Sequence, residues 1–300
     1  MSTGGAFRGK AILITGASSG IGEELAERLA QHGALLTLAA RRADVLSRVA
    51  ERIAAASGSR PLVIECDVTR DGDVEHAVSE TVDQRGKLDV VFANAGFGVA
   101  GQFAKLSLAD YRRQFETNVF GVLRTLYAAL PAVTRSRGQL VITGSVAGWV
   151  APPGVSAYAM SKFALRALAN SITPELAQRG VAVTLLSPGF VESNIRRVDN
   201  RGELHADAPE PLPPWLIVSR GVAVRQMLRA VALRRREAII TGHGRVLVAM
   251  ERLAPWVMRA DTEGWPPAVA ATARSPSEDR FPTKQAVVSS TCQAGCAVGT

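Results

Sequence analysis

Cysteine is scarce in this chain of 300 residues, which has three, Cys66, Cys292 and Cys296. Three cysteines cannot staple a chain of this length, and two of them lie within the last nine residues, where there is little to hold together. This excludes a small secreted domain built on disulfides. It favours a reducing compartment, so we expect a cytoplasmic protein.

Long apolar runs are also missing. No uninterrupted apolar stretch reaches the roughly 18 to 20 residues that span a bilayer, and residues 1–10 lack the apolar core of a secretory signal. The sequence therefore predicts a soluble protein. With 47% hydrophobic and 21% charged residues it can bury a full core, which excludes intrinsic disorder for the chain as a whole.

Lysine is rare, with 5 residues against 30 arginines, yet the net charge is +8. The basic excess lies late in the chain, because residues 191–260 hold 12 Lys and Arg against 7 Asp and Glu. Scattered charge on a solvated surface is the commoner cause of such a balance. We therefore expect no nucleic-acid partner.

A helix predicted at residues 245–260 carries three of these arginines seven residues apart, at Arg245, Arg252 and Arg259. Its apolar residues fall on another face and are Val246, Met250, Leu253 and Val257. We expect the apolar face to pack on the protein and the arginines to face solvent, with a kink at Pro255. Docking of this helix on an anionic membrane surface is the second, less favoured interpretation.

Short apolar runs alternate with helix-length amphipathic stretches along most of the chain. The runs are 11–15, 35–40, 62–65, 90–93, 140–143, 181–186 and 238–241. Parallel strands need crossover connections, and helices are the usual crossover. The alternation predicts an α/β fold: a doubly wound, Rossmann-type parallel sheet of about seven strands with helices on both faces. The runs are continuous and mostly apolar rather than alternating, as strands covered on both faces should be.

We expect a single nucleotide-binding domain over residues 1–260. Residues 192–216 break the pattern with charged side chains and four prolines, which predicts a substrate lid near the carboxyl ends of the strands. From residue 261 the composition turns to Pro, Ser, Thr, Ala and Gly without periodicity. A disordered tail is therefore expected over residues 261–300.

The turn after the first predicted strand is rich in glycine. Glycine permits a tight turn and lets the backbone approach a pyrophosphate, whose charge meets the N–H groups and positive dipole end of the following helix. A surface turn is the alternative, which the flanking strand and helix disfavour. The dinucleotide contacts expected here are Thr15, Gly16, Ser18, Ser19, Gly20, Ile21 and Gly22.

This turn resembles the Thr-Gly-x-x-x-Gly-x-Gly motif of the short-chain dehydrogenases/reductases, and the resemblance extends over roughly residues 8–245. Three further motifs follow in the family's order: Cys-Asp-Val at the adenine, Asn-Ala-Gly after the fourth strand, and Pro-Gly at the nicotinamide. The resemblance implies cofactor contacts at Asp67, Val68, Asn94, Ala95, Gly96, Pro188, Gly189 and Val191.

The end of the second predicted strand indicates which dinucleotide binds. Relatives that use NAD place an acidic residue there, whereas here Ala40 is followed by Arg41 and Arg42. An acid would repel a 2′-phosphate, while a guanidinium can bind it in a fork. NADP(H) is therefore favoured over NAD(H); the alternative is that both arginines only solvate a helix start.

Tyr158 and Lys162 lie four residues apart at the start of a predicted helix, so they share one face. A phenol with a reference pKa of about 10 is a poor proton carrier at neutral pH. A nearby cation stabilises the phenolate and lowers that pKa. The pair is therefore a candidate for acid–base catalysis.

Ser145 follows the strand predicted at 140–143, at the edge where ligands bind in such sheets. The family resemblance implies that Ser145 holds a substrate carbonyl oxygen, that Tyr158 exchanges its proton, and that Lys162 lowers the Tyr158 pKa and binds the nicotinamide ribose. It also implies that Asn118 positions a water in a proton relay. A helix cap for Ser145 and a satisfied buried amide for Asn118 are the alternatives.

The predicted activity is hydride transfer between NADP(H) and a carbonyl or alcohol, with no metal ion. A non-catalytic dinucleotide sensor and an epimerase or dehydratase of the same superfamily are the rivals. His32, His76, His205 and His243 lack metal-ligand spacing and are expected at the surface or at caps. Residues 97–103, 149–155 and 190–215 are rich in apolar and aromatic side chains, which favours an apolar substrate. We expect a homodimer or homotetramer.

Overall fold

The computed structural model describes residues 3–193, 195, 199–201, 207, 210 and 212–256. The lid predicted at 192–216 lies partly outside these residues, and the tail predicted at 261–300 lies wholly outside them. Cys292 and Cys296 fall in that second part.

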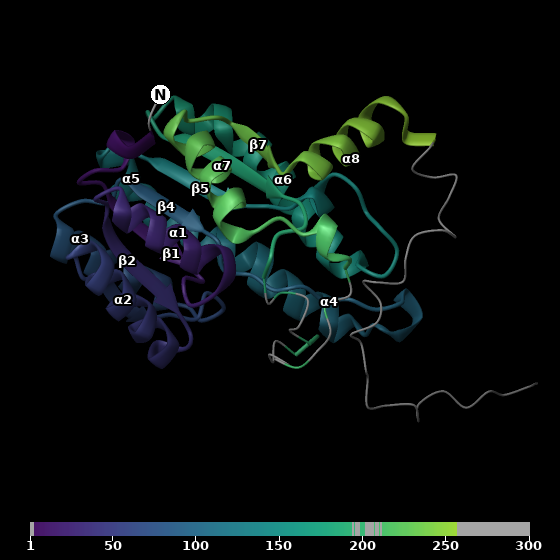
Figure 1. The fold of residues 1–300 in the computed structure, drawn as a ribbon, viewed down its shortest axis with the longest axis horizontal. Coiled ribbons are helices and arrows are strands. Elements are labelled where there is room, and N and C mark those ends of the chain that lie inside the picture. Colours follow the sequence, from purple (N-terminus) through teal and green to yellow (C-terminus); the bar gives the residue numbers. More distant parts are fainter. Residues whose placement is uncertain are drawn as a thin grey trace, which may run out of the picture.

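Seven parallel strands form one sheet in the order β3-β2-β1-β4-β5-β6-β7 (Figure 1). Their bounds are β1 Ala11–Thr15, β2 Leu35–Ala40, β3 Leu62–Glu65, β4 Val90–Ala93, β5 Gln139–Thr143, β6 Ala182–Pro188 and β7 Glu237–Ile240. The first four match the predicted bounds, and the last three differ by one or two residues. The predicted doubly wound α/β fold is confirmed.

Helices cover both faces of the sheet. Their bounds are α1 Gly20–Gln31, α2 Ala43–Ser57, α3 Asp73–Arg85, α4 Leu108–Phe115, α5 Gly121–Arg135, α6 Ser156–Ala177, α7 Arg220–Ala232 and α8 Gly242–Leu253. One core lies under α1, α2 and α7, with Leu29, Leu46 and Met227 fully buried. The other lies under α3, α5 and α6. Each fully buried leucine contributes about 1.5 to 3 kcal/mol, so the two cores fix the layers.

The sheet order places a switch point between β1 and β4. From β1 the chain runs outward through β2 and β3, whereas from β4 it runs the other way through β5, β6 and β7. The crossover helices therefore diverge at this point and leave a crevice outside the carboxyl ends of the two strands. The glycine-rich turn after β1 and the Asn-Ala-Gly segment after β4 both lie there.

The last helix of the described chain, α8, differs from its prediction. It ends at Leu253 because Pro255 disfavours helical backbone at Ala254, whose φ is −142°. Val246, Met250 and Leu253, expected to pack inward, are 59%, 36% and 80% exposed.

Other residues form the inner face of α8, including Val248, which is 2% exposed. Arg245 and Arg252 are exposed as predicted, and the Arg252 guanidinium also lies 4.2 Å from the ring centroid of Trp149. The predicted inward packing of Val246, Met250 and Leu253 is therefore wrong, while Val257 and Arg259 lie outside the described residues. In Figure 1, α8 lies at the end of the molecule away from α2 and α3. No helix within the described ranges is long and apolar enough to cross a bilayer.

Candidate active site

The turn between β1 and α1 needs glycine at three positions. Gly16 and Gly20 have φ angles of +67° and +61°, where side chains are strained. A Cβ on Gly16 would lie 2.8 Å from the Ala95 Cα, and one on Gly22 would lie 2.7 Å from the Asn94 Nδ2. The turn therefore presents bare backbone and the N-terminus of α1 to the crevice, which fits a bound pyrophosphate.

Asn94 and Thr15 connect the strand ends that border this turn. Thr15 Oγ1 accepts hydrogen bonds from the backbone nitrogens of Asn94 and Ala95, at 3.0 and 3.2 Å. Asn94 Nδ2 donates to the Thr15 carbonyl at 3.1 Å, and Thr143 Oγ1 donates to Asn94 Oδ1 at 3.2 Å. The ends of β1, β4 and β5 are thus held together by side chains.

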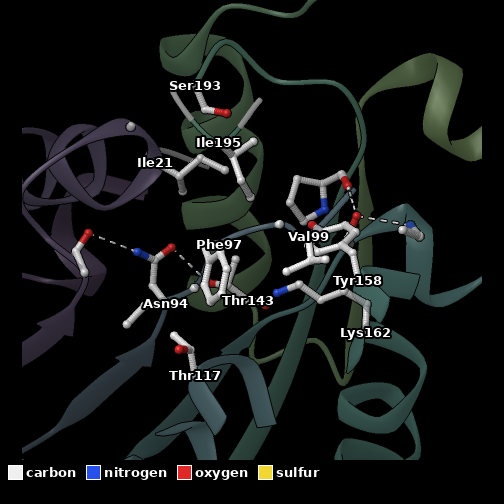
Figure 2. A pocket seen from close by; sticks show the side chains of 18 of the residues that line it. Ile21, Asn94, Phe97, Val99, Thr117, Thr143, Tyr158, Lys162, Ser193 and Ile195 are labelled. Atoms are coloured by element: carbon white, nitrogen blue, oxygen red, sulfur yellow. Dashed lines mark hydrogen bonds between the residues drawn. The ribbon is translucent and has the colours of Figure 1, made fainter. Parts of the chain in front are cut away.

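A cavity of about 990 Å³ lies over these strand ends. It is lined by every predicted site residue except Thr15 and Asn118. Figure 2 shows Tyr158 and Lys162 on one side of the cavity and Asn94 on the other, with Ile21, Ser193 and Ile195 along one wall. The structure therefore brings the dinucleotide turn and the predicted catalytic side chains to one space.

Tyr158 and Lys162 extend from the first turns of α6. The Lys162 ammonium is buried, lies 5.6 Å from the centroid of the Tyr158 ring, and donates a hydrogen bond to the Thr143 carbonyl at 2.9 Å. Burial lowers the pKa of Lys162 to about 8. No ion pair joins Lys162 to a carboxylate among the residues that the structure describes.

Ser145 follows β5 and is half-buried. Its Oγ accepts from the backbone nitrogen of Ala147 at 3.1 Å and makes a long, 3.5 Å contact to the Pro188 carbonyl. The hydroxyl therefore lies between the end of β5 and the turn after β6. Because its donated contact is weak, the Ser145 proton is available to a stronger acceptor in the cavity.

Asn118 lies in a π-helical segment, residues Glu116–Phe120, between α4 and α5. Its fully buried side chain donates to the Phe97 carbonyl at 3.0 Å and to Ser161 Oγ at 3.2 Å, and accepts from the Phe97 nitrogen at 3.1 Å. The amide thus ties the segment after β4 to α6. Its role in a proton relay stays a prediction.

Arg41 and Arg42 follow β2 and line the cavity with exposed side chains. Arg42 Nη2 lies 3.5 Å from Ser18 Oγ in the glycine-rich turn. Asp67 and Glu116 are the carboxylates that line the described cavity, and Asp67 already accepts two hydrogen bonds from Thr69. β2 itself contains no carboxylate that could pair with Arg41 or Arg42.

His243 was expected at the surface or at a cap, but it is half-buried and lines the cavity. That prediction is wrong. The position of His243 could not be read from the sequence, because no local pattern shows that β7 ends beside the turn after β6. Arg112, Arg113 and Arg201, which sequence reasoning also missed, line the cavity too.

No group of three or more His, Cys, Asp or Glu able to hold a metal occurs in the described part of the chain. Apolar side chains form a further wall: Phe97, Val99, Val150, Pro152, Val155, Leu212 and Leu247.

Known proteins are similar to this chain in sequence and in fold. The family model of the short chain dehydrogenases matches residues 10–204. The 11-beta-hydroxysteroid dehydrogenase 1A of Arabidopsis thaliana is 39% identical over 189 residues, which cover 62% of this chain and 54% of the plant protein. The match to this and four other plant 11-beta-hydroxysteroid dehydrogenases spans 54% to 58% of their length.

Two solved structures are also similar. A short chain dehydrogenase/reductase from Burkholderia phymatum in complex with NAD is 26% identical with a TM-score of 0.74, covering 84% of this chain and 95% of that one. An alcohol dehydrogenase from the archaeon Thermococcus sibiricus complexed with 5-hydroxy-NADP is 27% identical with a TM-score of 0.66, covering 76% and 94%. The chain belongs to the short-chain dehydrogenase family and has the Rossmann-type fold of these structures.

Proposed function

We propose that the protein interconverts a ketone or aldehyde and an alcohol with NADP(H), and that it works in the cytoplasm as a homodimer or homotetramer. The convergence of Ser145, Tyr158 and Lys162 on the cavity that the glycine-rich turn borders carries this proposal. A non-catalytic sensor has no need of a tyrosine and a buried lysine four residues apart.

The residues present fit a nicotinamide dinucleotide. The glycine-rich turn and the N-terminus of α1 would hold the pyrophosphate, and the Asp67–Val68 segment would border the adenine. Lys162 would hold the nicotinamide ribose, with Pro188 and Gly189 at the ring. When bound, the nicotinamide supplies or accepts a hydride at its C4.

The chain's own side chains handle the proton. In the reductive direction Tyr158 Oη gives its proton to the alkoxide oxygen as it forms, and Ser145 Oγ donates a hydrogen bond to the same oxygen. The Lys162 ammonium beside the tyrosine ring stabilises the resulting phenolate. Asn118 acts as a positioning residue, because its amide holds both the Phe97 backbone and Ser161.

The preference for NADP(H) is supported by Arg41 and Arg42. Both follow β2 at the cavity wall, where a 2′-phosphate on the adenosine ribose would lie. A guanidinium can bind such a phosphate through two parallel hydrogen bonds.

An apolar substrate is supported by the aliphatic and aromatic wall of the cavity, formed by residues such as Val99, Val155 and Leu247. The plant relatives bear the name of hydroxysteroid dehydrogenases. We therefore propose a bulky apolar ketone or alcohol, such as a steroid, as the substrate class.

The test is NADPH absorbance with a panel of steroid, acyl-chain and aromatic ketones and aldehydes. We expect turnover of at least one apolar carbonyl, and Tyr158→Phe should lower kcat by about a hundredfold or more, because the proton donor is lost. Tyr127→Phe is the matched control, since Tyr127 is 72% exposed on α5.

Three results would contradict the proposal. Full activity of Tyr158→Phe would remove the tyrosine from the mechanism. Tight NADPH binding without turnover of any panel member would favour the sensor, and epimerised product without net NADPH consumption would favour the epimerase.

A further inference from the structure

His243 contacts the backbone of the turn that follows β6. It is the second residue of α8, and its Nε2 lies 2.9 Å from the backbone nitrogen of Phe190. A backbone N–H can only donate, so Nε2 must present its lone pair. In the neutral ring the proton then resides on Nδ1, so this contact selects one tautomer and one charge state.

One backbone N–H group of this turn has the His243 side chain as its hydrogen-bond partner. Pro188 has no N–H, and the Gly189 N–H donates to the Ile240 carbonyl at 3.2 Å. The Phe190 carbonyl accepts from the Val218 N–H at 2.9 Å. The Phe190 N–H is thus held by a side chain, His243, while its neighbours are held by backbone.

The imidazole fits closely against the turn. Its ring stacks on Phe190 with centroids 5.4 Å apart and an interplanar angle of 19°. A Cβ on Gly189 would lie 2.5 Å from His243 Nε2, so glycine is required where the ring meets the backbone. A shift of the imidazole would therefore be transmitted to Gly189 and Phe190 directly.

Thr241 also contacts the imidazole at Nε2. Its Oγ1 lies 3.1 Å from His243 Nε2 and accepts from the Gly244 N–H at 3.3 Å. Thr241 has a φ of +84°, a conformation that strains a β-branched residue. Such strain persists where the surrounding structure requires it, and here it points the hydroxyl at the histidine.

Among the described residues, the groups for which a contact with the imidazole is seen are uncharged. Phe190 and Gly189 come from the turn after β6, and Thr241 from the end of β7. On α8 itself, Arg245 is hydrogen-bonded to the Ile239 carbonyl and to Gln226 of α7. Burial lowers the pKa of His243, which favours the neutral ring.

The other titratable groups that share the cavity are Tyr158 and Lys162 of α6, Arg41 and Arg42 after β2, Asp67 after β3, Arg112, Arg113 and Glu116 of α4 and its π-helical extension, Cys66, and Arg201.

We propose that His243 is a positioning residue for hydride transfer: its unprotonated Nε2 holds the Pro188–Gly189–Phe190 turn beside Ser145. Ser145 Oγ touches the same turn at the Pro188 carbonyl. Protonation would turn Nε2 into a donor that faces the Phe190 N–H and would release the turn. The inference rests on the proposed function, because that turn is where the nicotinamide ring would lie.

The first test is a long-range ¹H–¹⁵N NMR spectrum of the histidine rings in the full-length protein without cofactor at neutral pH. We expect His243 to be neutral with its proton on Nδ1 and with an unprotonated, hydrogen-bonded Nε2. A His243 ring with a proton on Nε2 would overturn the inference. His76, exposed on α3, serves as the reference ring and should show ordinary tautomer exchange.

The second test compares His243→Leu, His243→Gln and the control His76→Gln. Leucine fills space without an acceptor, so it should raise the Kd for NADPH and lower kcat by about tenfold each. Glutamine places an amide oxygen near the position of Nε2 and does not titrate. It should lie within about threefold of the wild type in both quantities and should lose the acidic limb that His243 gives the kcat/KM profile.

Three outcomes would overturn the inference: a leucine variant with wild-type Kd and kcat, a glutamine variant as impaired as the leucine variant, or an acidic limb that persists unchanged in His243→Gln. If His243→Leu does not fold, the tautomer of His243 measured by NMR and the pH profile of kcat/KM for His243→Gln decide whether the inference holds. Absence of carbonyl turnover by the wild type would contradict the proposed function, whereas the tautomer and the NADPH Kd would still test the hold of His243 on the turn.

Discussion

At the scale of single residues, the burial of the Lys162 ammonium destabilises the fold, and this burial points to a role in the chemistry of the site. Its ammonium is buried against Thr143 and Tyr158 without a described carboxylate partner, and burial disfavours the charged form. Folding alone would be served as well by an apolar side chain of similar length. A residue that destabilises the fold in this way fits a role in chemistry.

This cost has a defined dependence on pH. The unfolded chain, with a lysine pKa of 10.5, binds the Lys162 proton more tightly than the folded protein, with a pKa of about 8. The free energy of unfolding should therefore rise with pH between about 8 and 10.5. Relative to Lys162→Met, the wild type should gain on the order of 3 kcal/mol across that window.

Urea unfolding of the wild type and Lys162→Met at pH 7 and pH 10.5, each also made with Tyr158→Phe to remove the phenol that is coupled to Lys162, measures this gain, because the remaining titrating groups cancel in the difference. A difference between the two proteins that does not change with pH would show that Lys162 is solvated rather than buried.

A substitution at Arg41 tests the proposed preference for NADP(H) over NAD(H). Arg41→Asp should lower the ratio of kcat/KM with NADPH to that with NADH by about tenfold or more, since a charge-assisted contact is replaced by repulsion of the 2′-phosphate. Steady-state rates with both cofactors give the ratio. Arg229→Asp, which makes the same charge change on an exposed position of α7 away from the cavity, should leave it unchanged. An unaltered preference in Arg41→Asp would remove this residue from the cofactor site.

At the scale of elements, the strands were predictable because each is a mostly apolar run that ends at a turn. The last helix was not. In α8 one arc contains Gly244 and Val248 and another contains Val246, Met250 and Leu253, so periodicity alone offers two apolar faces. Tertiary contacts decide which of the two faces packs inward, since Thr241 caps the helix and the Arg252 guanidinium lies over the ring of Trp149.

The orientation of α8 leads to a matched pair of substitutions. Val248→Ala should lower the free energy of unfolding by about 2 kcal/mol, because it leaves a cavity in a site that is 2% exposed. Leu253→Ala, at a site that is 80% exposed, should change it by about 0.5 kcal/mol or less. Chemical denaturation at low protein concentration measures both. Equal losses would mean that the outer face of α8 is covered in solution.

At the scale of the whole molecule, the order of the sheet gathers residues that are far apart in the chain. Gly16, Asn94, Ser145 and Gly189 follow four different strands, yet all line one cavity because parallel strands end at the same edge. Motifs with local signatures could therefore be assigned to the site from sequence. His243 and Arg112 have no such signature, and only the tertiary structure brings them to the same cavity.

The central claim is that a hydride passes from NADPH to a carbonyl carbon in this cavity. The direct measurement is mass spectrometry of the alcohol formed from an accepted apolar ketone with NADPH that carries two deuterium atoms at C4. We predict one deuterium on the carbinol carbon of the wild-type product, and loss of product formation in Tyr158→Phe. Alcohol without deuterium at that carbon, or equal labelling by Tyr158→Phe at the wild-type rate, would contradict the account.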